Sequence, residues 1–230
     1  MTLNPKLDPT CVLCLTWGEA GGSTAYDQSQ YGNNGTIYGA ARTSGRPRWA
    51  LSFDGVDDYV YVPYSPSFDV QVFTLVAWAY YIPKTTSDSY IIYKPNINHH
   101  LSLYVESNTF IFVGAVTFTD GTTLFGKIDT RYAKSIANVF RMYALRYDGA
   151  TFDVFIDATK YFTATVGKTV ATGAYPLLVG ARGASYFNGL IGEVRIYSRA
   201  LSDKEIYTLY VYGLESLRKA PPLRGGGLEW

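Results

Sequence analysis

Apolar residues along this chain fall in short runs that alternate with polar positions every second residue. The stretch Asp58-Tyr59-Val60-Tyr61-Val62 is an example, because alternation places Tyr59 and Tyr61 on one face of a strand and the two valines on the other. The runs are rich in Val, Ile, Tyr, Phe and Thr and end at turn residues, which is typical of β-strands. The predicted strands cover residues 11–17, 49–53, 58–63, 72–82, 89–93, 100–105, 110–117, 139–147, 151–157, 160–165, 176–181 and 186–197.

Asp-Gly pairs mark three of the predicted turns. Asp54-Gly55, Asp120-Gly121 and Asp148-Gly149 each supply a residue that adopts positive φ, as tight hairpins require. The segments on either side of Asp148-Gly149, residues 142–147 and 151–157, form the clearest predicted hairpin. Many strands at this spacing without intervening helices predict an antiparallel sandwich or barrel.

One helix is predicted near the C-terminus. Ser202-Asp203-Lys204-Glu205 has the form of a capping box, in which the serine and the glutamate satisfy each other's backbone amides. Ile206, Leu209 and Tyr210 then fall on one apolar face, and Gly213 is a helix stop signal.

The chain shows no internal repeat and no second domain. We expect one domain over residues 1–214, followed by a flexible tail rich in Pro and Gly over residues 215–230. The last residues, Leu228-Glu229-Trp230 after three glycines, leave two interpretations open: a disordered tail, or a short hook for a neighbouring subunit.

Composition and charge exclude several classes of protein. The chain has 230 residues, and 20 Lys+Arg against 19 Asp+Glu give a net charge of +1, which argues against a nucleic-acid partner. Apolar residues at 47% and aromatic residues at 16%, with 21 tyrosines, exclude intrinsic disorder. We expect no membrane span, because no apolar run approaches about 18 residues. The first residues lack a secretory signal, so either export by that route does not occur or the chain is a processed or recombinant form.

The two cysteines and two histidines do not suggest a metal or redox site. Alternation within one strand places Cys11 and Cys14 on opposite faces, so we expect two unpaired thiols, one of them in the core. A zinc site would need a second pair of ligands, and the adjacent His99 and His100 would point to opposite faces of a strand.

Three blocks of sequence resemble the laminin-G-like branch of the concanavalin A-like lectin/glucanase family. They are Thr24-Ala25-Tyr26-Asp27-Gln28-Ser29-Gln30-Tyr31-Gly32-Asn33-Asn34-Gly35-Thr36-Ile37, Leu51-Ser52-Phe53-Asp54-Gly55-Val56-Asp57-Asp58-Tyr59-Val60, and Phe187-Asn188-Gly189-Leu190-Ile191-Gly192-Glu193-Val194-Arg195-Ile196-Tyr197. Their order and spacing extend the resemblance over about residues 10–212. It implies an all-β fold, an antiparallel jelly-roll β-sandwich of the concanavalin A type, whose concave sheet and rim loops hold ligands.

The resemblance also suggests a structural calcium ion. Calcium takes about six to eight oxygen ligands, and Asp27 and Asn33 in the first block offer such oxygens. In the family fold the third block returns beside this loop, which would add Glu193, although Gly192 stands where relatives often have Asp. The alternative is that Asp27 makes only an Asx-turn. The acidic residues of 54–58 are assigned to a turn and a strand start.

Aromatic rings and planar polar side chains are the residue types that recognise carbohydrate. Tyr80, Tyr81, Tyr93 and Asn98 lie at predicted strand ends and loops and are the predicted ligand-binding residues. Core packing is the alternative role for most of the aromatic residues, because each buried ring covers a large area.

The chain lacks the residues that catalysis would need. Glycoside hydrolysis usually requires two carboxylates that face one cleft. Asp153 and Asp157 share a strand face, but no glutamate accompanies them and Asp157 falls at the strand end. There is no nucleophile-elbow context for a catalytic triad and no glycine-rich phosphate loop. We therefore predict that the protein is not an enzyme.

Three functions follow, in order of preference. The first is a non-catalytic recognition or adhesion module that binds a glycan or a protein surface. The second is a structural subunit of a repeating assembly, such as a virion, a surface filament or a sheath, which self-assembles through aromatic surface and the C-terminal tail. The third is a glycoside hydrolase. The first two predict an extracellular, cell-surface or virion-associated location.

Overall fold

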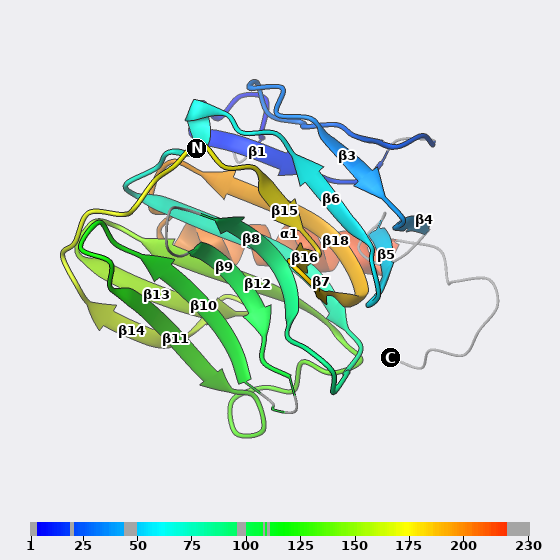
Figure 1. Cartoon of the computed structure of the whole chain (residues 1–230). Coiled ribbons are helices and arrows are strands. Elements are labelled where there is room, and N and C mark those ends of the chain that lie inside the picture. Colours follow the sequence, from blue (N-terminus) through cyan, green and yellow to red (C-terminus); the bar gives the residue numbers. More distant parts are fainter. Residues whose placement is uncertain are drawn as a thin grey trace.

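The computed structural model describes residues 4–18, 21–43, 50–95, 100–107, 109 and 111–219. Two large antiparallel sheets face each other, and a C-terminal helix lies behind them in the view of Figure 1. The predicted all-β sandwich is therefore confirmed. Asn96 to His99 and the residues after Lys219 lie outside the described residues.

The first sheet, called sheet A, is built around the long strands β7 and β18. Strand β18 pairs with β7 on one side and with β5 and β1 on the other, so it joins distant parts of the chain. The order is β14 (Thr159–Thr165), β13 (Thr151–Ile156), β12 (Phe140–Tyr147), β7 (Phe73–Tyr81), β18 (Asn188–Tyr197), β5 (Ala50–Asp54) and β4 (Ala41–Thr43), with β1 (Cys11–Leu15) also on β18.

The second sheet, called sheet B, has eight strands among the described residues. Its order is β11 (Thr123–Asp129), β10 (Ile111–Thr117), β9 (His100–Val105), β8 (Ser89–Pro95), β15 (Leu177–Val179), β6 (Tyr59–Val62), β3 (Gly35–Tyr38) and β2 (Thr24–Ala25). A separate two-stranded ribbon consists of β16 (Ala181–Arg182) and β17 (Ser185–Tyr186), and a 3-10 turn η1 (Pro66–Phe68) precedes β7.

Every predicted strand range overlaps an observed strand, but several observed strands lie outside those ranges. Strands β2, β3 and β4 have two to four residues, too few for a two-residue period to stand out. Strand β11 lies at the edge of sheet B, where Gly126 and Lys127 interrupt the apolar pattern. Edge strands need fewer apolar residues because one side meets solvent.

Two of the three predicted Asp-Gly hairpins are confirmed. Gly121 has φ +82° between β10 and β11, and Gly149 has φ +95° between β12 and β13. The third prediction is wrong, because β5 belongs to sheet A and β6 to sheet B. Gly55 has φ +81° as expected, but the turn there carries the chain from one sheet to the other. Local turn chemistry sets the backbone angle and not the strand's partner.

The main core fills the space between the two sheets. The inward side chains of β6, Val60 and Val62, are fully buried there. In β10 and β11, Gly114 pairs with Gly126, and a Cβ atom on Gly126 would lie 2.5 Å from Cγ2 of Val154. The two glycines therefore allow sheet B to approach sheet A closely at this end of the sandwich.

Helix α1 (Asp203–Lys219) covers the outer face of sheet A. The capping box is confirmed, since the Ser202 amide donates to Glu205 Oε2 at 2.8 Å and the Glu205 amide donates to Ser202 Oγ at 3.3 Å. Ile206 and Leu209 pack in a second apolar cluster with Trp78 of β7. Within the described residues, no helix combines the length and apolar character that a membrane span requires.

The predicted helix stop at Gly213 is wrong. The helix continues to Lys219, five residues into the range that the sequence assigns to a flexible tail. A Cβ atom on Gly213 would overlap the indole ring of Trp78, and Trp78 stacks on Tyr210 with ring centroids 5.8 Å apart. Gly213 is thus a site of close packing between helix and sheet.

The prediction that Cys11 and Cys14 face opposite sides is also wrong. Both thiols are unpaired and buried in the cluster beneath α1. The pairing of β1 with β18 is irregular between Cys11 and Leu13, and this irregularity shifts the alternation by one residue.

Candidate functional site

The outer face of sheet B carries a set of tyrosines held in register by strand pairing. The tyrosines and valines of β6 lie on opposite faces, as predicted: Val60 and Val62 are buried, while Tyr61 is 37% exposed on the outer face. Tyr61 pairs with Leu178 of β15, and Leu178 pairs in turn with Tyr93 of β8. Side chains that are paired directly across strands lie on the same face, so these residues form a row across the sheet.

A stacked pair of rings lies beside this row. Tyr38 of β3 pairs in register with Tyr59 of β6. The two ring centroids are 4.7 Å apart with an interplanar angle of 15°, and Tyr38 is 46% exposed. The stack presents a flat aromatic surface held by two strands.

A bulge in β8 determines which residues face outward there. The register shift between Tyr90 and Ile92 lets Ile91 and Ile92 both enter the core, while Tyr90 and Tyr93 belong to the outer cluster. Tyr90 stacks on Tyr104 of β9 with centroids 4.6 Å apart, and meets Tyr93 edge-on at 5.7 Å. We call the six tyrosines on this side of sheet B the tyrosine face: Tyr38, Tyr59, Tyr61 and Tyr93, which are at least partly exposed, and Tyr90 and Tyr104, which are buried.

One cation lies against the tyrosine face. Arg182 of β16 places its guanidinium 5.4 Å from the ring centroids of both Tyr90 and Tyr93. Its Nη1 donates a hydrogen bond of 2.6 Å to the Tyr90 hydroxyl. Burial raises the pKa of Tyr90 and of Tyr104, so both phenols stay protonated at neutral pH.

The chemistry of this surface suits binding. Aromatic rings offer apolar planes, their hydroxyls donate and accept hydrogen bonds, and the guanidinium supplies a fixed positive charge. The rings stand on strands, which hold them with little conformational freedom to lose on binding. The tyrosine face therefore provides groups that can recognise a ligand.

Of the predicted ligand residues, Tyr93 lies on the tyrosine face and two others do not. Tyr81 is 5% exposed and packs between the sheets near Phe187, because β7 is a central strand with both faces covered. Tyr80, also 5% exposed, points to the other face of sheet A and contacts Phe140. Neither ring is presented to a ligand, and Asn98 lies outside the described residues.

The sequence contained a signal for the residues it did not assign. The alternation correctly predicts that Tyr59 and Tyr61 share a face, yet only knowledge of the neighbouring strands reveals Tyr38 and Tyr104 on the same face. Arg182 lies in a two-residue strand that periodicity does not detect.

The predicted calcium ligand Asp27 organises its own loop. Its Oδ1 accepts the amides of Cys14 at 2.8 Å and Ser29 at 2.9 Å. Its Oδ2 accepts the Ser29 hydroxyl at 2.6 Å and the Asn33 amide at 2.9 Å. Four donors occupy this carboxylate, as the Asx-turn alternative requires.

The other two predicted calcium ligands also have protein partners. The Asn33 side-chain amide donates to the Val12 carbonyl at 2.7 Å, and Glu193 accepts from Arg195 Nε at 2.7 Å on the helix side of sheet A. Together with the four donors on Asp27, these contacts do not fit a calcium ligand set. A structural calcium ion stays a prediction.

A second acidic group serves the turn between the sheets. Carboxylate oxygens of Asp54, Asp57 and Asp58 lie within 4.8 Å of one another. Asp58 Oδ2 accepts the Asp54 amide at 2.9 Å, and Asp54 Oδ1 accepts the Val56 amide at 2.8 Å. These bonds agree with the predicted role in a turn and a strand start.

The two aspartates considered for hydrolysis are held in separate ion pairs. Asp153 accepts from Arg146 Nε at 3.0 Å, and Asp157 accepts from Arg141 Nη1 at 2.8 Å. Burial raises the pKa of Asp153, but hydrogen bonds from Thr163 and Arg146 outweigh it and leave the pKa below its usual value. A carboxyl that stays ionised cannot act as the general acid of a glycosidase.

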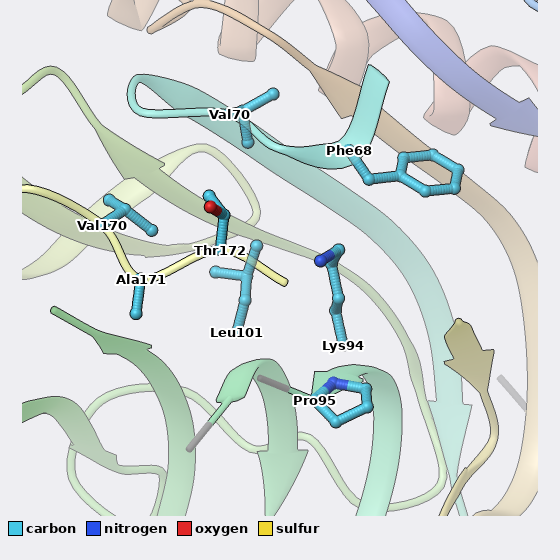
Figure 2. Close-up of a pocket in the computed structure, with 8 residues that line it drawn as sticks. All are labelled: Phe68, Val70, Lys94, Pro95, Leu101, Val170, Ala171 and Thr172. Carbon is cyan, nitrogen blue, oxygen red and sulfur yellow. The ribbon is translucent and has the colours of Figure 1, made fainter. Parts of the chain in front are cut away.

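A small pocket at one end of the sandwich is unsuited to a saccharide. Its volume is about 10 Å³, roughly the space of one water molecule. Figure 2 shows its single charged side chain, Lys94, whose Nζ donates to the Gly173 carbonyl at 2.9 Å and lies 3.6 Å from Asp69 Oδ1. The lining residues are Phe68, Val70, Lys94, Pro95, Leu101, Val170, Ala171 and Thr172.

Solved structures with the same fold include toxin binding domains. The chain resembles the binding domain of Paraclostridial Mosquitocidal Protein 1, with a TM-score of 0.70 and 15% identity over 87% of this chain and 52% of that one. For the botulinum neurotoxin serotype G binding domain the TM-score is 0.72, with 12% identity over 88% of this chain and 51% of that one. The chain therefore spans about half the length of these structures.

A Trypanosoma rangeli sialidase in complex with sialic acid is similar over a smaller part of its length. Its TM-score is 0.66, with 19% identity over 92% of this chain and 34% of the sialidase. At these identities the likeness establishes the fold alone.

Comparison at the level of sequence places the chain in a family. No curated protein matches it. The laminin-G-type family model described as "Concanavalin A-like lectin/glucanases superfamily" matches residues 53–207, more than half of the chain. The match includes most of the second and third sequence blocks and confirms the resemblance drawn from them. The chain belongs to the concanavalin A-like lectin/glucanases superfamily.

Proposed function

We propose that the protein is a non-catalytic recognition module that binds a glycan through the tyrosine face. The observation that carries the proposal is the group of four at least partly exposed tyrosines on one outer sheet face, Tyr38, Tyr59, Tyr61 and Tyr93, with Tyr90 and Tyr104 buried beside them. The family and the toxin binding domains of the same fold support a binding role. The proposal places the protein in an extracellular, cell-surface or virion-associated setting.

The arrangement of rings favours a glycan over a flat protein surface. A pyranose has one face of C–H groups, which packs on an aromatic ring, and a rim of hydroxyls, which bonds with tyrosine hydroxyls. The Tyr38–Tyr59 stack and the exposed Tyr61 offer both on adjacent strands. Strands in a sheet lie about 4.8 Å apart, so Tyr61 and Tyr93, two strands apart, span about 10 Å. This span suits a disaccharide or a longer glycan.

A glycan array with the full chain tests the proposal. We expect wild-type binding, and a loss of affinity of up to about tenfold for Tyr61→Ala, because an aromatic ring contact contributes about 0.5 to 1.5 kcal/mol beyond its buried area. Tyr132→Ala is the matched control, since Tyr132 is 86% exposed in the turn after β11, away from the tyrosine face. Repeating the array with added calcium and with EDTA shows whether glycan binding depends on calcium. Failure of the wild type to bind any glycan in either arm contradicts the proposal.

The alternative of a self-assembling structural subunit stays a prediction. Tyr207 and Tyr212 of α1 are 59% and 61% exposed, on the opposite side of the molecule from the tyrosine face. Exposed tyrosines are frequent in protein interfaces. Light scattering in the same buffers as the array distinguishes a monomeric module from an assembling subunit.

A further inference from the structure

We propose that Arg182 makes the tyrosine face selective for a saccharide that carries a carboxylate. This inference rests on the proposed function and goes beyond it by naming the chemical class of the ligand. Its basis is the geometry of one guanidinium, its lack of an acidic partner, and its place relative to the tyrosine row.

Arg182 is fixed in place by aromatic contacts. The guanidinium lies 5.4 Å from two ring centroids, those of Tyr90 and Tyr93, which meet each other edge-on. The Nη1 hydrogen bond of 2.6 Å to the Tyr90 hydroxyl sets the direction of its plane. A planar cation held in this way loses little further freedom when it binds an anion.

The charge of Arg182 differs from that of most other arginines in the molecule. Arginines of the described residues that form ion pairs with Asp or Glu are Arg131, Arg141, Arg146, Arg195 and Arg199. Arg42 donates to backbone carbonyls of Trp17 and Thr24. Within the described part of the chain, Arg182 forms no ion pair, and its contacts are with tyrosines.

An exposed guanidinium of this kind has donors left for a ligand. Arginine carries five N–H donors in a fork that matches the two oxygens of a carboxylate. Arg182 is exposed, and its hydrogen bonds to Tyr90 and Tyr93 leave other N–H groups of the fork for a ligand. A sugar acid can form a pair of charge-assisted hydrogen bonds with the guanidinium through its carboxylate. A neutral sugar has no carboxylate and cannot form this pair.

The position of Arg182 fits a ligand that also contacts the rings. The ribbon strand β16 follows β15 after only Gly180, and β15 lies between β6 and β8. Arg182 thereby covers Tyr93, at one end of the row that runs through Leu178 to Tyr61. If Arg182 binds the carboxylate, the adjoining sugar ring can lie over the row from Tyr93 to Tyr61.

Two matched pairs of probes test the inference by calorimetry. The pairs are 3′-sialyllactose against lactose, and tetragalacturonate against its methyl ester. We expect at least one acidic probe to bind about tenfold more tightly than its neutral counterpart, as hydrogen bonds to charged groups predict. Raised salt should narrow the difference, since the guanidinium is exposed. This comparison uses only the wild-type chain, so it does not depend on whether a variant folds.

Variants of Arg182 assign the preference to this residue. Arg182→Gln should remove the preference for the acidic probe, and Arg182→Lys should retain part of it, because a point charge remains without the bidentate fork. Arg131→Gln, which changes an exposed arginine in the turn after β11, is the control and should keep the full preference. Thermal unfolding of each variant accompanies the titrations.

The outcomes separate the two levels of the proposal. If both probes of each pair bind equally, or if Arg182→Gln keeps the full preference, the inference about acidic saccharides is overturned while the glycan-binding function stands. If wild type binds no glycan on the array, both are overturned. Preference in the wild type that is lost in Arg182→Gln and kept in Arg131→Gln supports the inference.

Discussion

The outer faces of the two sheets both carry aromatic residues, but the two faces differ in how far these residues are buried. On sheet A, Trp78 of β7 and Phe155 of β13 are buried beneath α1 with Leu209. On sheet B, Tyr38 and Tyr61 remain substantially exposed. Both faces arise from the same two-residue alternation, so the alternation does not decide which face becomes core. The helix covers the outer face of sheet A, whereas on sheet B exposed and buried tyrosines lie side by side.

Ion pairs add to the cover on sheet A. Arg146 of β12 donates to Asp153 of β13 and, through Nη1, to Asp203 in the first turn of α1 at 2.7 Å. The same Nη1 donates to the Leu201 carbonyl at 2.7 Å. The start of the helix is thereby tied to two strands, whereas Arg182, beside the tyrosine face, is held by aromatic rings.

The largest expected effect comes from removing the ring beneath the helix. Trp78→Ala should lower the free energy of unfolding by about 3 to 5 kcal/mol, because a large buried side chain leaves a cavity. Tyr61→Ala, the counterpart on sheet B, should change it by about 0.5 kcal/mol or less. Urea unfolding followed by tryptophan and tyrosine fluorescence measures both. Equal losses in the two variants would contradict the division into a covered face and an open face.

A smaller effect is expected from separating the helix from sheet A. Gly213→Val should destabilise the protein by about 1 to 3 kcal/mol, since the added side chain overlaps the Trp78 ring. The matched control is Gly21→Ala, where an added Cβ meets no heavy atom within 4 Å. If α1 is displaced in the valine variant, binding of a hydrophobic dye should rise as the sheet A face becomes exposed. Wild-type stability in Gly213→Val would show that the helix does not depend on this contact.

The smallest of these effects concerns the capping box and depends on pH. A side-chain hydrogen bond from Arg199 and bonds from Ser202 lower the pKa of Glu205 from the usual 4.5 to about 2. A lowered folded-state pKa stabilises the fold above the unfolded value, and this contribution disappears as pH falls from 4.5 towards 2.

Glu205→Gln should therefore cost about 1 kcal/mol at neutral pH. The same variant should reduce the loss of stability on acidification. Thermal unfolding of variant and wild type between neutral and acid pH gives both numbers. A pH dependence identical to that of the wild type would rule out this role for Glu205.

The sequence predicted the fold well because its main strands are long enough to display a period. The strands from Phe73 to Tyr81 and from Asn188 to Tyr197 are examples, and the capping box at Ser202 fixed the start of the helix. Errors occurred where one residue changes the pairing. The irregularity at Cys11 turns a thiol to the other face, and the Asp54-Gly55 turn joins two sheets.

The candidate site was harder to predict because it is a property of neighbouring strands. Tyr80 and Tyr81 carry the same side chain as Tyr61, and only the position of β7 in the middle of sheet A explains their burial. The tyrosine face depends on β3, β6, β8 and β9 lying in one sheet. Arg182 reaches it from a ribbon of two-residue strands, for which no sequence period exists.

The pairing of β18 has a consequence for folding during synthesis on the ribosome. This strand contacts β1, β5 and β7, which precede it by more than a hundred residues. Sheet A cannot be completed until β18 has been synthesised, so the earlier strands emerge with unpaired edges. Contacts so distant in sequence favour slow folding with a high contact order, and a nascent chain in that state is prone to aggregation. The yield of folded protein should therefore rise at lowered temperature, or with chaperones that bind β5 and β7 until β18 has been synthesised.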